Sequence, residues 1–291
     1  MKKRMLWVCG VLAVCFVLLA VLAVSHLNRN PNVGVSLTDP DGDAVLPESL
    51  VQADLKVHTG NVAELPDGCA AFVIEAADIT LAEPIVQAAE DVPVIFVNRK
   101  PEMENACYIG GDAYQAGATQ GALLLAQSVR GDWNEDGVVT CLLLGAGMSQ
   151  PDMEKWRAGI SDSLSDAGFE TEFIAYEGTV FSAADAKAVC AQKLSAYGKD
   201  LEAVLMCYDS VVPGVLEAIQ SVGRSVGRNL TLIGAGYNSD LAALVAEGKL
   251  SGYAYVDEEM LCQAVIAAVE ACRVDKAPEG LLLEYTKVLP K

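Results

Sequence analysis

Histidine is scarce in this chain: only His26 and His58 occur among its 291 residues. His26 follows an apolar amino-terminal run, and His58 falls at the end of a predicted strand. Neither has a convincing nucleophile partner, and no carboxylate pair, catalytic triad or cluster of catalytic metal ligands is visible. The sequence therefore predicts that the protein is not an enzyme.

Paired cysteine motifs are missing too. The chain has nine cysteines, and no two of them form a C-x-x-C motif. Cys9 and Cys15 lie in the apolar amino-terminal run, whereas the other seven, an odd number, fall mostly inside apolar strands and helices. Because free cysteine behaves as a small buried hydrophobic residue, we expect buried thiols rather than a disulfide framework.

Basic residues are few beyond the amino terminus. Residues 1–27 hold three of the 20 basic residues and no acidic one, so the remainder carries 17 basic and 39 acidic residues, a net charge of −22. Such a charge repels nucleic acid and anionic lipid headgroups. Solubility is its simplest role.

Residues 1–27 form a targeting segment. Three basic residues precede an uncharged apolar run over residues 5–24, and about 20 such residues can cross a membrane as a helix. The basic flank should remain cytoplasmic, which places the rest of the chain outside the cell membrane. We expect an uncleaved single-pass anchor; a cleaved signal peptide and a lipid attached at Cys15 remain alternatives.

Beyond the anchor, apolar runs of strand length alternate with amphipathic runs of helix length, which is typical of α/β proteins with parallel sheets. The predicted strands span 33–38, 55–59, 70–75, 93–98, 107–110, 139–145, 171–176, 202–208, 230–235, 251–256 and 283–288. The predicted helices span 80–91, 113–129, 152–167, 182–197, 211–223, 238–248 and 257–273. This part of the chain is long enough for two modest lobes.

The stretch GDWNEDGVVT contains an oxygen-rich turn. Asp132, Asn134 and Asp136 occupy the first, third and fifth positions of a calcium loop, and Val138 and Thr140 would supply oxygens at the seventh and ninth. Position twelve lacks the bidentate glutamate of an EF-hand. The turn itself leaves two interpretations open: a cation site completed by a remote carboxylate, or a plain turn whose side chains bond to their own backbone.

A polar loop and an amphipathic helix follow the next strand. Apolar residues recur at steps of three and four along the helix and form one stripe, which includes Trp156. Asp152 suits the first turn, where its charge meets the helix dipole. In open α/β sheets, ligands bind beyond the carboxyl ends of the strands, which places Gln150, Asp152 and Trp156 near a crevice.

From about residue 92 to residue 272 the chain resembles the galactose/glucose-binding branch of the type I periplasmic binding proteins. The resemblance is carried by VPVIFVNRKP, YIGGDAYQAGATQGALL, GDWNEDGVVTCLLLGAGMSQPDMEKWRAGISDSLSDAG, LEAVLMCYDSVVPGVLEAI and LTLIGAGYNSDLAALVAEGKLSGYAYVDEE. It implies two Rossmann-like lobes, joined by three crossovers, that close on one sugar. The expected lobes are 28–111 with 257–280, and 112–256 with 281–291.

The resemblance also implies a structural calcium ion, held by a loop like DWNEDGVVT and by a remote glutamate just before a strand. The matching glutamate is Glu202, in DLEAVLM. The expected metal ligands are Asp132, Asn134, Asp136, Val138, Thr140 and Glu202.

For the ligand site, the resemblance implies polar contacts from Asn98 and Asp152, which keep the residue types of the family. Gln150 and Trp156 stand where His and Arg are usual, and Tyr208 stands where Asn is usual. Gly236 and Val256 replace another Asp and another Asn. The expected ligand residues are Asp41, Asp43, Asn98, Gln150, Asp152, Trp156, Tyr208 and Tyr237, with the two early aspartates as alternatives for one acidic position. Tyr237 and Trp156 have two interpretations: stacking platforms for a ligand ring, or packing in the core or between the lobes.

Two classes of function follow from these features. The first is a membrane-anchored binding protein for a monosaccharide or a related solute, serving an ABC-type importer or a sensor. The second is an interaction scaffold that keeps the fold and the calcium loop but binds no sugar. The stretch 33–101 is short for a first lobe, so we also expect one face of its sheet to be uncovered and to meet the membrane, a partner or a second copy.

Overall fold

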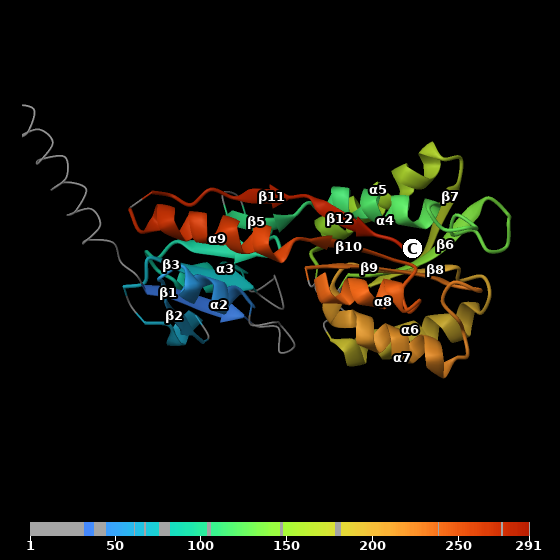
Figure 1. The fold of residues 1–291 in the computed structure, drawn as a ribbon, viewed down its shortest axis with the longest axis horizontal. Helices are drawn as coiled ribbons and strands as arrows, with labels where there is room; N and C mark the ends of the chain where they lie inside the picture. The colour runs from blue at the N-terminus through green and yellow to red at the C-terminus, as the bar shows by residue number, and fades with distance from the viewer. Residues whose placement is uncertain are drawn as a thin grey trace, which may run out of the picture.

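The computed structural model describes residues 32–37, 45–60, 62–66, 68–75, 82–103, 106–145, 148–177, 182–237, 239–274 and 276–290. These residues fold into two lobes, each built on a six-stranded sheet, that lie side by side along the long axis of the molecule (Figure 1). The predicted α/β class with two lobes of parallel sheet is confirmed.

The first sheet is wholly parallel and has the strand order β11-β5-β4-β3-β1-β2. Its inner strands are short apolar runs, such as AFVIE in β3, and four of those five residues are buried, as expected for a parallel sheet covered on both faces. The strands are β1 (Asn32–Leu37), β2 (Lys56–Thr59), β3 (Ala71–Glu75), β4 (Val94–Val97), β5 (Cys107–Gly111) and β11 (Leu281–Leu283).

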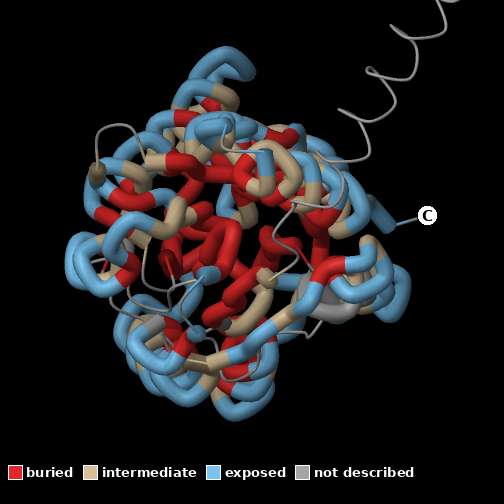
Figure 2. The backbone as a smooth tube through the Cα atoms, turned by 90° about the vertical axis from the view of Figure 1, so that its left-hand side faces the viewer, coloured by how far each residue is buried: buried red, intermediate tan, exposed pale blue. Residues whose placement is uncertain are grey.

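The second sheet has the order β12-β10-β9-β8-β6-β7, and all its pairs are parallel except β10 with β12. Its inner strands β8 and β9 are buried along their whole length. Figure 2 shows buried segments of the chain gathered in the interior, with exposed segments around the outside. The strands are β6 (Val138–Leu144), β7 (Glu170–Glu177), β8 (Ala203–Met206), β9 (Thr231–Gly236), β10 (Gly252–Val256) and β12 (Tyr285–Val288).

Several helices begin at a side chain that caps free backbone amides. Ser149 caps α5 by accepting a hydrogen bond from the amide of Asp152, and Ser182 and Asp257 cap α6 and α9 in the same way. The helices are α2 (Val45–Gln52), α3 (Ala82–Ala88), α4 (Ala113–Leu125), α5 (Gln150–Asp166), α6 (Ala183–Tyr197), α7 (Val212–Ser221), α8 (Ala243–Ala246) and α9 (Glu258–Cys272), with 3-10 turns η1 (Val62–Glu64), η3 (Asp209–Val211) and η4 (Ser239–Ala242).

Three segments connect the lobes. The chain leaves the first lobe between β5 and α4, returns between β10 and α9, and leaves again between β11 and β12 (Figure 1). The expected assignment of residues 281–291 to the second lobe is therefore wrong at its start. Leu281–Leu283 pair with β5 in the first sheet, so this last crossover lies at Glu284.

Both faces of the first sheet are covered, and the expectation of an uncovered face is wrong. On one face, α2 and α9 pack over the strands. On the other face, Leu65 and Cys69 from the short stretch after β2 join Ala82 and Ala89 around α3. These four residues complete a small core with the sheet residues Phe72, Ile74, Phe96 and Tyr108. Two side chains from an irregular segment thus replace the missing crossover helix.

The expected anchor, residues 1–27, lies outside the described residues. Within the described part of the chain, no helix is both long and apolar enough to span a bilayer.

The seven cysteines of the described part are all free and buried, as the sequence predicts. Burial raises the pKa of the Cys107 thiol to about 11 and that of the Cys190 thiol to about 12. These thiols therefore stay protonated and pack as small apolar side chains.

Candidate functional site

The carboxyl ends of three strands bring polar groups to one place between the lobes. Asn98 follows β4 in the first lobe, whereas Tyr208 and Tyr237 follow β8 and β9 in the second. The backbone carbonyl of Asn98 accepts hydrogen bonds from the hydroxyls of Tyr208, at 3.1 Å, and Tyr237, at 3.3 Å. Three of the predicted ligand residues therefore meet where α/β sheets usually bind ligands.

Asn98 lies in a tight turn that fixes its side chain. Its φ is 63°, and the amide of Arg99 donates to the carbonyl of Val97 at 2.6 Å, the pattern of a γ-turn. Its Nδ2 donates to Oε1 of Glu75 at 2.7 Å. Its Oδ1 is buried with no hydrogen-bond partner among the described residues, so it is available to accept from a ligand hydroxyl.

Arg99 is 4% exposed and lies over the Tyr208 ring, with its guanidinium carbon 4.9 Å from the ring centroid. Burial raises the pKa of the Tyr208 hydroxyl well above its ordinary value; the nearby Tyr237 adds to this effect, and the charge of Arg99 opposes it. The hydroxyl of Tyr208 consequently remains a donor at neutral pH.

The first turn of α5 approaches the same place. The side chain of Asp152 is 13% exposed, and its Oδ1 lies 2.9 Å from Nζ of Lys155. Its negative charge is one of the causes that raise the pKa of Tyr208, so Asp152 lies within electrostatic range of the site. Gln150 is exposed and donates along the helix to Glu154, at 3.2 Å. The structure thus places Asp152 within electrostatic range of Tyr208 and Gln150 on the surface.

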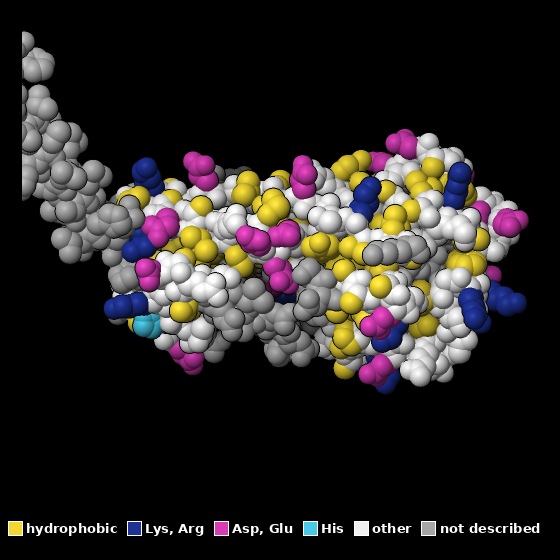
Figure 3. All heavy atoms as spheres, viewed as in Figure 1, with side chains coloured by type: hydrophobic (Ala, Val, Ile, Leu, Met, Phe, Trp, Pro, Cys, Tyr) yellow, Lys and Arg dark blue, Asp and Glu magenta, His cyan; other side chains and the backbone are white. Residues whose placement is uncertain are grey.

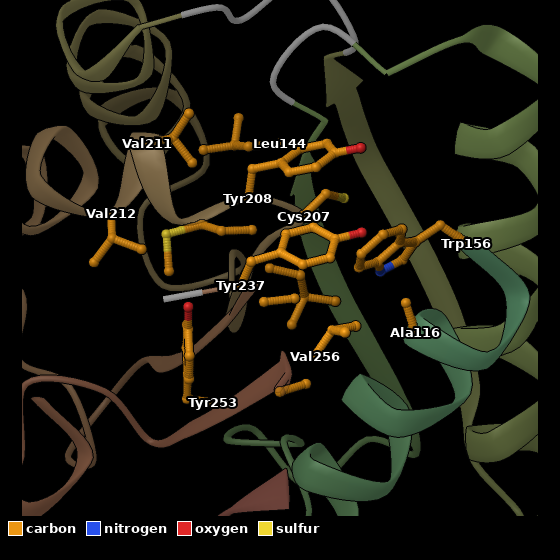
Figure 4. Close-up of a cluster of buried hydrophobic side chains, with 14 of the residues drawn as sticks. Ala116, Leu144, Trp156, Cys207, Tyr208, Val211, Val212, Tyr237, Tyr253 and Val256 are labelled. Carbon is orange, nitrogen blue, oxygen red and sulfur yellow. The ribbon is translucent and has the colours of Figure 1, made fainter. Parts of the chain in front are cut away.

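Trp156 belongs to the core and is only 2% exposed. Its Nε1 donates to Oε1 of Gln120 at 2.8 Å, and its ring meets that of Tyr285 edge-on, with centroids 6.2 Å apart. Figure 4 shows it within a cluster of buried hydrophobic side chains. Of the two interpretations of Trp156, the structure favours core packing over ligand stacking, because its apolar stripe faces inward.

Sequence reasoning missed four residues around Asn98. Glu75 and Arg99 contact the site as described, and Tyr108 donates to the carbonyls of Gly111, at 3.1 Å, and Asn98, at 3.4 Å. A signal existed for Glu75, the one charged residue of an apolar strand and its last position. Asp41 and Asp43, by contrast, lie outside the described residues. The missed residues bonded to Asn98 or next to it in the chain are Glu75, Arg99 and Tyr108, and the fourth is Tyr285, whose ring lies against Gly111.

The loop at 132–140 is closed by its own side chains. Oδ2 of Asp132 accepts from the amide of Gly137 at 2.9 Å, Oδ1 of Asn134 accepts from Asp136 at 3.0 Å, and Oδ1 of Asp136 accepts from Val138 at 2.8 Å. Gly137 has a φ of 87°, a conformation that favours glycine. The side chains therefore hold their oxygens on the inside of the turn.

Glu202 reaches this loop from the residue before β8. Its Oε1 accepts from the amides of Trp133, at 2.6 Å, and Asn134, at 3.0 Å, and its Oε2 accepts from Thr140 at 3.1 Å. The side chain is fully buried. Burial raises the pKa of its carboxyl, the three amides partly oppose this, and the charge of Asp132 raises it further.

The donor set of this loop fits a hard cation. Asp132 and Glu202 are buried, and neither forms an ion pair with Lys or Arg among the described residues, so a cation would relieve their repulsion. In that same part of the chain, no three His, Cys, Asp or Glu side chains gather closely enough to hold an ion by themselves. A calcium ion would thus also need oxygens of Asn134, Val138 and Thr140.

Two parallel-sheet lobes joined by three crossovers, with polar residues meeting between them, define a bilobed binding protein rather than an open single-sheet domain. A model of the periplasmic binding protein domain matches residues 62–273, and the chain belongs to this family. Its predicted resemblance to the type I periplasmic binding proteins is confirmed.

One relative is the D-galactose/methyl-galactoside binding periplasmic protein MglB of Haemophilus influenzae, which is 28% identical over 214 residues. The match covers 69% of this chain and 63% of that protein, so the chain spans less than two thirds of this relative. The similarity is consistent with the galactose/glucose-binding branch.

Solved structures share the fold. The Caulobacter myo-inositol binding protein superposes with a TM-score of 0.71 at 15% identity, covering 89% of this chain and 93% of that one. The fructose binding periplasmic domain of a hybrid two component system superposes with a TM-score of 0.70 at 20% identity, covering 88% and 90%.

Proposed function

We propose that the protein binds a small polyhydroxylated solute, such as a monosaccharide or a cyclic polyol, in the crevice between its lobes. The observation that carries this proposal is the meeting of Asn98 and Glu75 from the first lobe with Tyr208 from the second, with the charge of Asp152 near enough to act on Tyr208. A solute that bonds to residues of both lobes would favour the closed arrangement of the lobes. Relatives that bind galactose, myo-inositol and fructose support the same class of ligand.

The chemistry of the crevice suits uncharged hydroxyl groups. Oδ1 of Asn98 and the carboxylates of Glu75 and Asp152 accept hydrogen bonds, and the guanidinium of Arg99 donates them. Each ligand hydroxyl that lost such a partner in a buried site would lower the binding free energy by about 1–3 kcal/mol.

We propose further that the protein acts outside the cell membrane, tethered by residues 1–27. It would either pass its solute to an ABC-type importer or present its closed form to a sensor. The sequence of the apolar run supports the tether, and the family supports the extracytoplasmic location.

The interaction scaffold remains a second candidate function. One observation favours it: Tyr208 and Tyr237 are each 8% exposed, and their hydroxyls already bond to the opposite lobe. Polar groups that satisfy one another leave fewer for a ligand.

A structural calcium ion in the 132–140 loop is part of the proposal. It would be held by Asp132, Asn134, Asp136, the carbonyl of Val138, Thr140 and Glu202, and its charge would offset that of the buried carboxylates. The chain's own contribution is to pre-form the turn through the amide hydrogen bonds to Asp132, Asn134 and Asp136.

A thermal-shift screen of the purified chain with monosaccharides, cyclic polyols, amino sugars and nucleosides tests the ligand. A solute at 100 times its Kd should stabilise the folded state by about 2.7 kcal/mol. Asn98→Ala should abolish the response, and Gln220→Ala, on the exposed face of α7, should retain it. No response to any compound, together with an intact response to calcium, would favour the scaffold.

Calcium binding has its own test. Calcium should raise the unfolding midpoint of the wild type, and the double variant Asp132→Asn/Glu202→Gln should lose this response. Glu135→Gln, an exposed acidic position in the same turn, is the matched control and should keep it. An unchanged response in the double variant would show that the metal assignment is wrong.

A further inference from the structure

Two tyrosines of the second lobe reach across the crevice to the first. The rings of Tyr208 and Tyr237 lie close together, and their hydroxyl oxygens point to the same side (Figure 4). Both hydroxyls donate to one atom, the carbonyl oxygen of Asn98. These are hydrogen bonds between the lobes that need no ligand atom.

Tyr237 also reaches the end of β5, next to the first crossover. Its hydroxyl accepts a hydrogen bond from the amide of Gly111 at 3.0 Å while it donates to Asn98. The Tyr237 side chain therefore holds the turn after β4 and the last residue of β5 at the same time. Its position is fixed in turn by the hydrogen bond from its own amide to Oδ2 of Asp209, at 3.1 Å.

The acceptor is rigid. The γ-turn at Asn98 orients its carbonyl toward the second lobe, and the hydrogen bond from its side chain to Glu75 holds the turn. On the donor side, Arg99 of the first lobe lies over the ring of Tyr208, which adds a second contact between the lobes. Burial raises the pKa values of the Tyr208 and Tyr237 hydroxyls, so both keep their donor protons.

We propose that Tyr208 and Tyr237 form an interlobe latch, in which the protein's own hydroxyls make bridging hydrogen bonds that would otherwise fall to a ligand. The latch deepens the proposed function by naming the control of its closure, and it needs no assumption about which solute binds. If each hydroxyl changes the ratio of closed to open protein about fivefold, the pair changes it about 25-fold.

This latch has a consequence for signalling and transport. A binding protein whose closure depends on its ligand presents its closed face only when loaded. Here, the two tyrosine hydroxyls supply part of the free energy of closure, so part of the protein is already closed before solute arrives. A ligand then converts only the smaller fraction of protein that is still open.

Hydrogen–deuterium exchange of the full chain in detergent, with no added sugar, tests the latch. In Tyr208→Phe/Tyr237→Phe, the amides of residues 98–103 and 108–113 should exchange about tenfold faster or more, with the amide of Gly111 most affected. The control is Tyr114→Phe, which removes the 2.9 Å hydrogen bond to Asp162 between α4 and α5 of a single lobe.

The comparison is decisive in either direction. Faster exchange confined to the double variant, with its unfolding midpoint near that of the control, supports the latch even if no sugar ever binds. Exchange in the double variant equal to that in Tyr114→Phe overturns it, whatever the sugar screen returns. If the double variant fails to fold, the single variant Tyr237→Phe gives the same test at the Gly111 amide.

Discussion

At the scale of single residues, Glu202 has the largest role in the 132–140 loop. Its carboxylate is the acceptor for three backbone amides, and its side chain is fully buried. In Glu202→Gln, an amide nitrogen would replace one of the two oxygens and face a backbone donor. We expect the free energy of unfolding to fall by about 1–3 kcal/mol in urea titrations, measured without calcium. Glu135→Gln, exposed in the same turn, should change it by less than about 0.5 kcal/mol.

The pH dependence of stability follows from the same carboxyl. Burial, the largest cause, and the charge of Asp132 raise its folded pKa above its ordinary value of 4.5. The folded state therefore holds the Glu202 proton more tightly than the unfolded state does. The stabilisation is full below pH 4.5 and is lost as the pH rises through the folded pKa.

Glu202→Gln should remove this part of the pH dependence, so the stability difference between the variant and the wild type should change above pH 4.5. Urea titrations at a series of pH values measure it. Saturating calcium should reverse the sign, because the ion favours the ionised carboxylate. Parallel pH profiles for the wild type and Glu202→Gln would contradict the assignment of the shift to this residue.

Sequence reasoning succeeded at residues whose chemistry is local. Asp132, Asn134 and Asp136 lie within five positions, so their spacing alone predicts an oxygen-lined turn. The prediction of Trp156 as a ligand residue failed, because an aromatic residue on an apolar stripe can lie either in the core or at a ligand site. Only the structure shows that Gln120, 36 residues away, accepts its indole proton.

At the scale of elements, the pairing of α4 with α5 sets the position of the α5 first turn. The two helices approach so closely that a Cβ at Gly117 would lie 2.0 Å from the carbonyl oxygen of Trp156, and one at Gly159 would lie 2.2 Å from that of Tyr114. Backbone atoms cannot move aside as side chains can. The glycines therefore allow α5 to lie close against α4, and this sets the position of Asp152 in the first turn of α5.

Gly117→Ala should consequently force the helices apart, even though alanine is the better helix former. We expect the free energy of unfolding to fall by about 1–3 kcal/mol. Binding of any solute found in the screen should also weaken, because the first turn of α5 moves. Urea titration and calorimetry measure the two effects. Ser165→Ala, on the exposed face of α5, is the control, and equal stability of the two variants would contradict close packing as the cause.

Predictions of helices and strands failed where one continuous run in the sequence forms two separate elements. Residues 283–288 read as one strand, yet Leu281–Leu283 pair with β5 and Tyr285–Val288 pair with β10. Likewise, the run 238–248 reads as one helix and forms η4 followed by the short α8. Period and propensity describe a segment, but the sheet that a segment joins depends on partners far along the chain.

At the scale of the whole molecule, the alternation of strands and helices beyond residue 27 predicted the α/β class, and the family resemblance predicted the two lobes. The sequence could not predict how the crevice is filled, since this depends on side chains from β4, β8 and β9 meeting across lobes. Acidic and basic side chains are dispersed over both lobes in Figure 3, so the net charge of −19 forms no single patch on this face.

Gly111, the last residue of β5 before the first crossover, lies against Tyr285, the first residue of β12 after the third. A Cβ at Gly111 would come within 2.3 Å of the Tyr285 ring, which itself packs against Trp156. Gly111→Ala should therefore displace the third crossover and change the angle between the lobes. Small-angle X-ray scattering should show a larger radius of gyration, and the free energy of unfolding should fall by about 1–3 kcal/mol.

Gly252→Ala is the control, because its Cβ would lie 3.1 Å from the end of the Leu123 side chain inside one lobe. A scattering curve of Gly111→Ala that matches those of the control and the wild type would mean that the Tyr285 ring moves aside freely, and that the two crossovers do not jointly set the arrangement of the lobes.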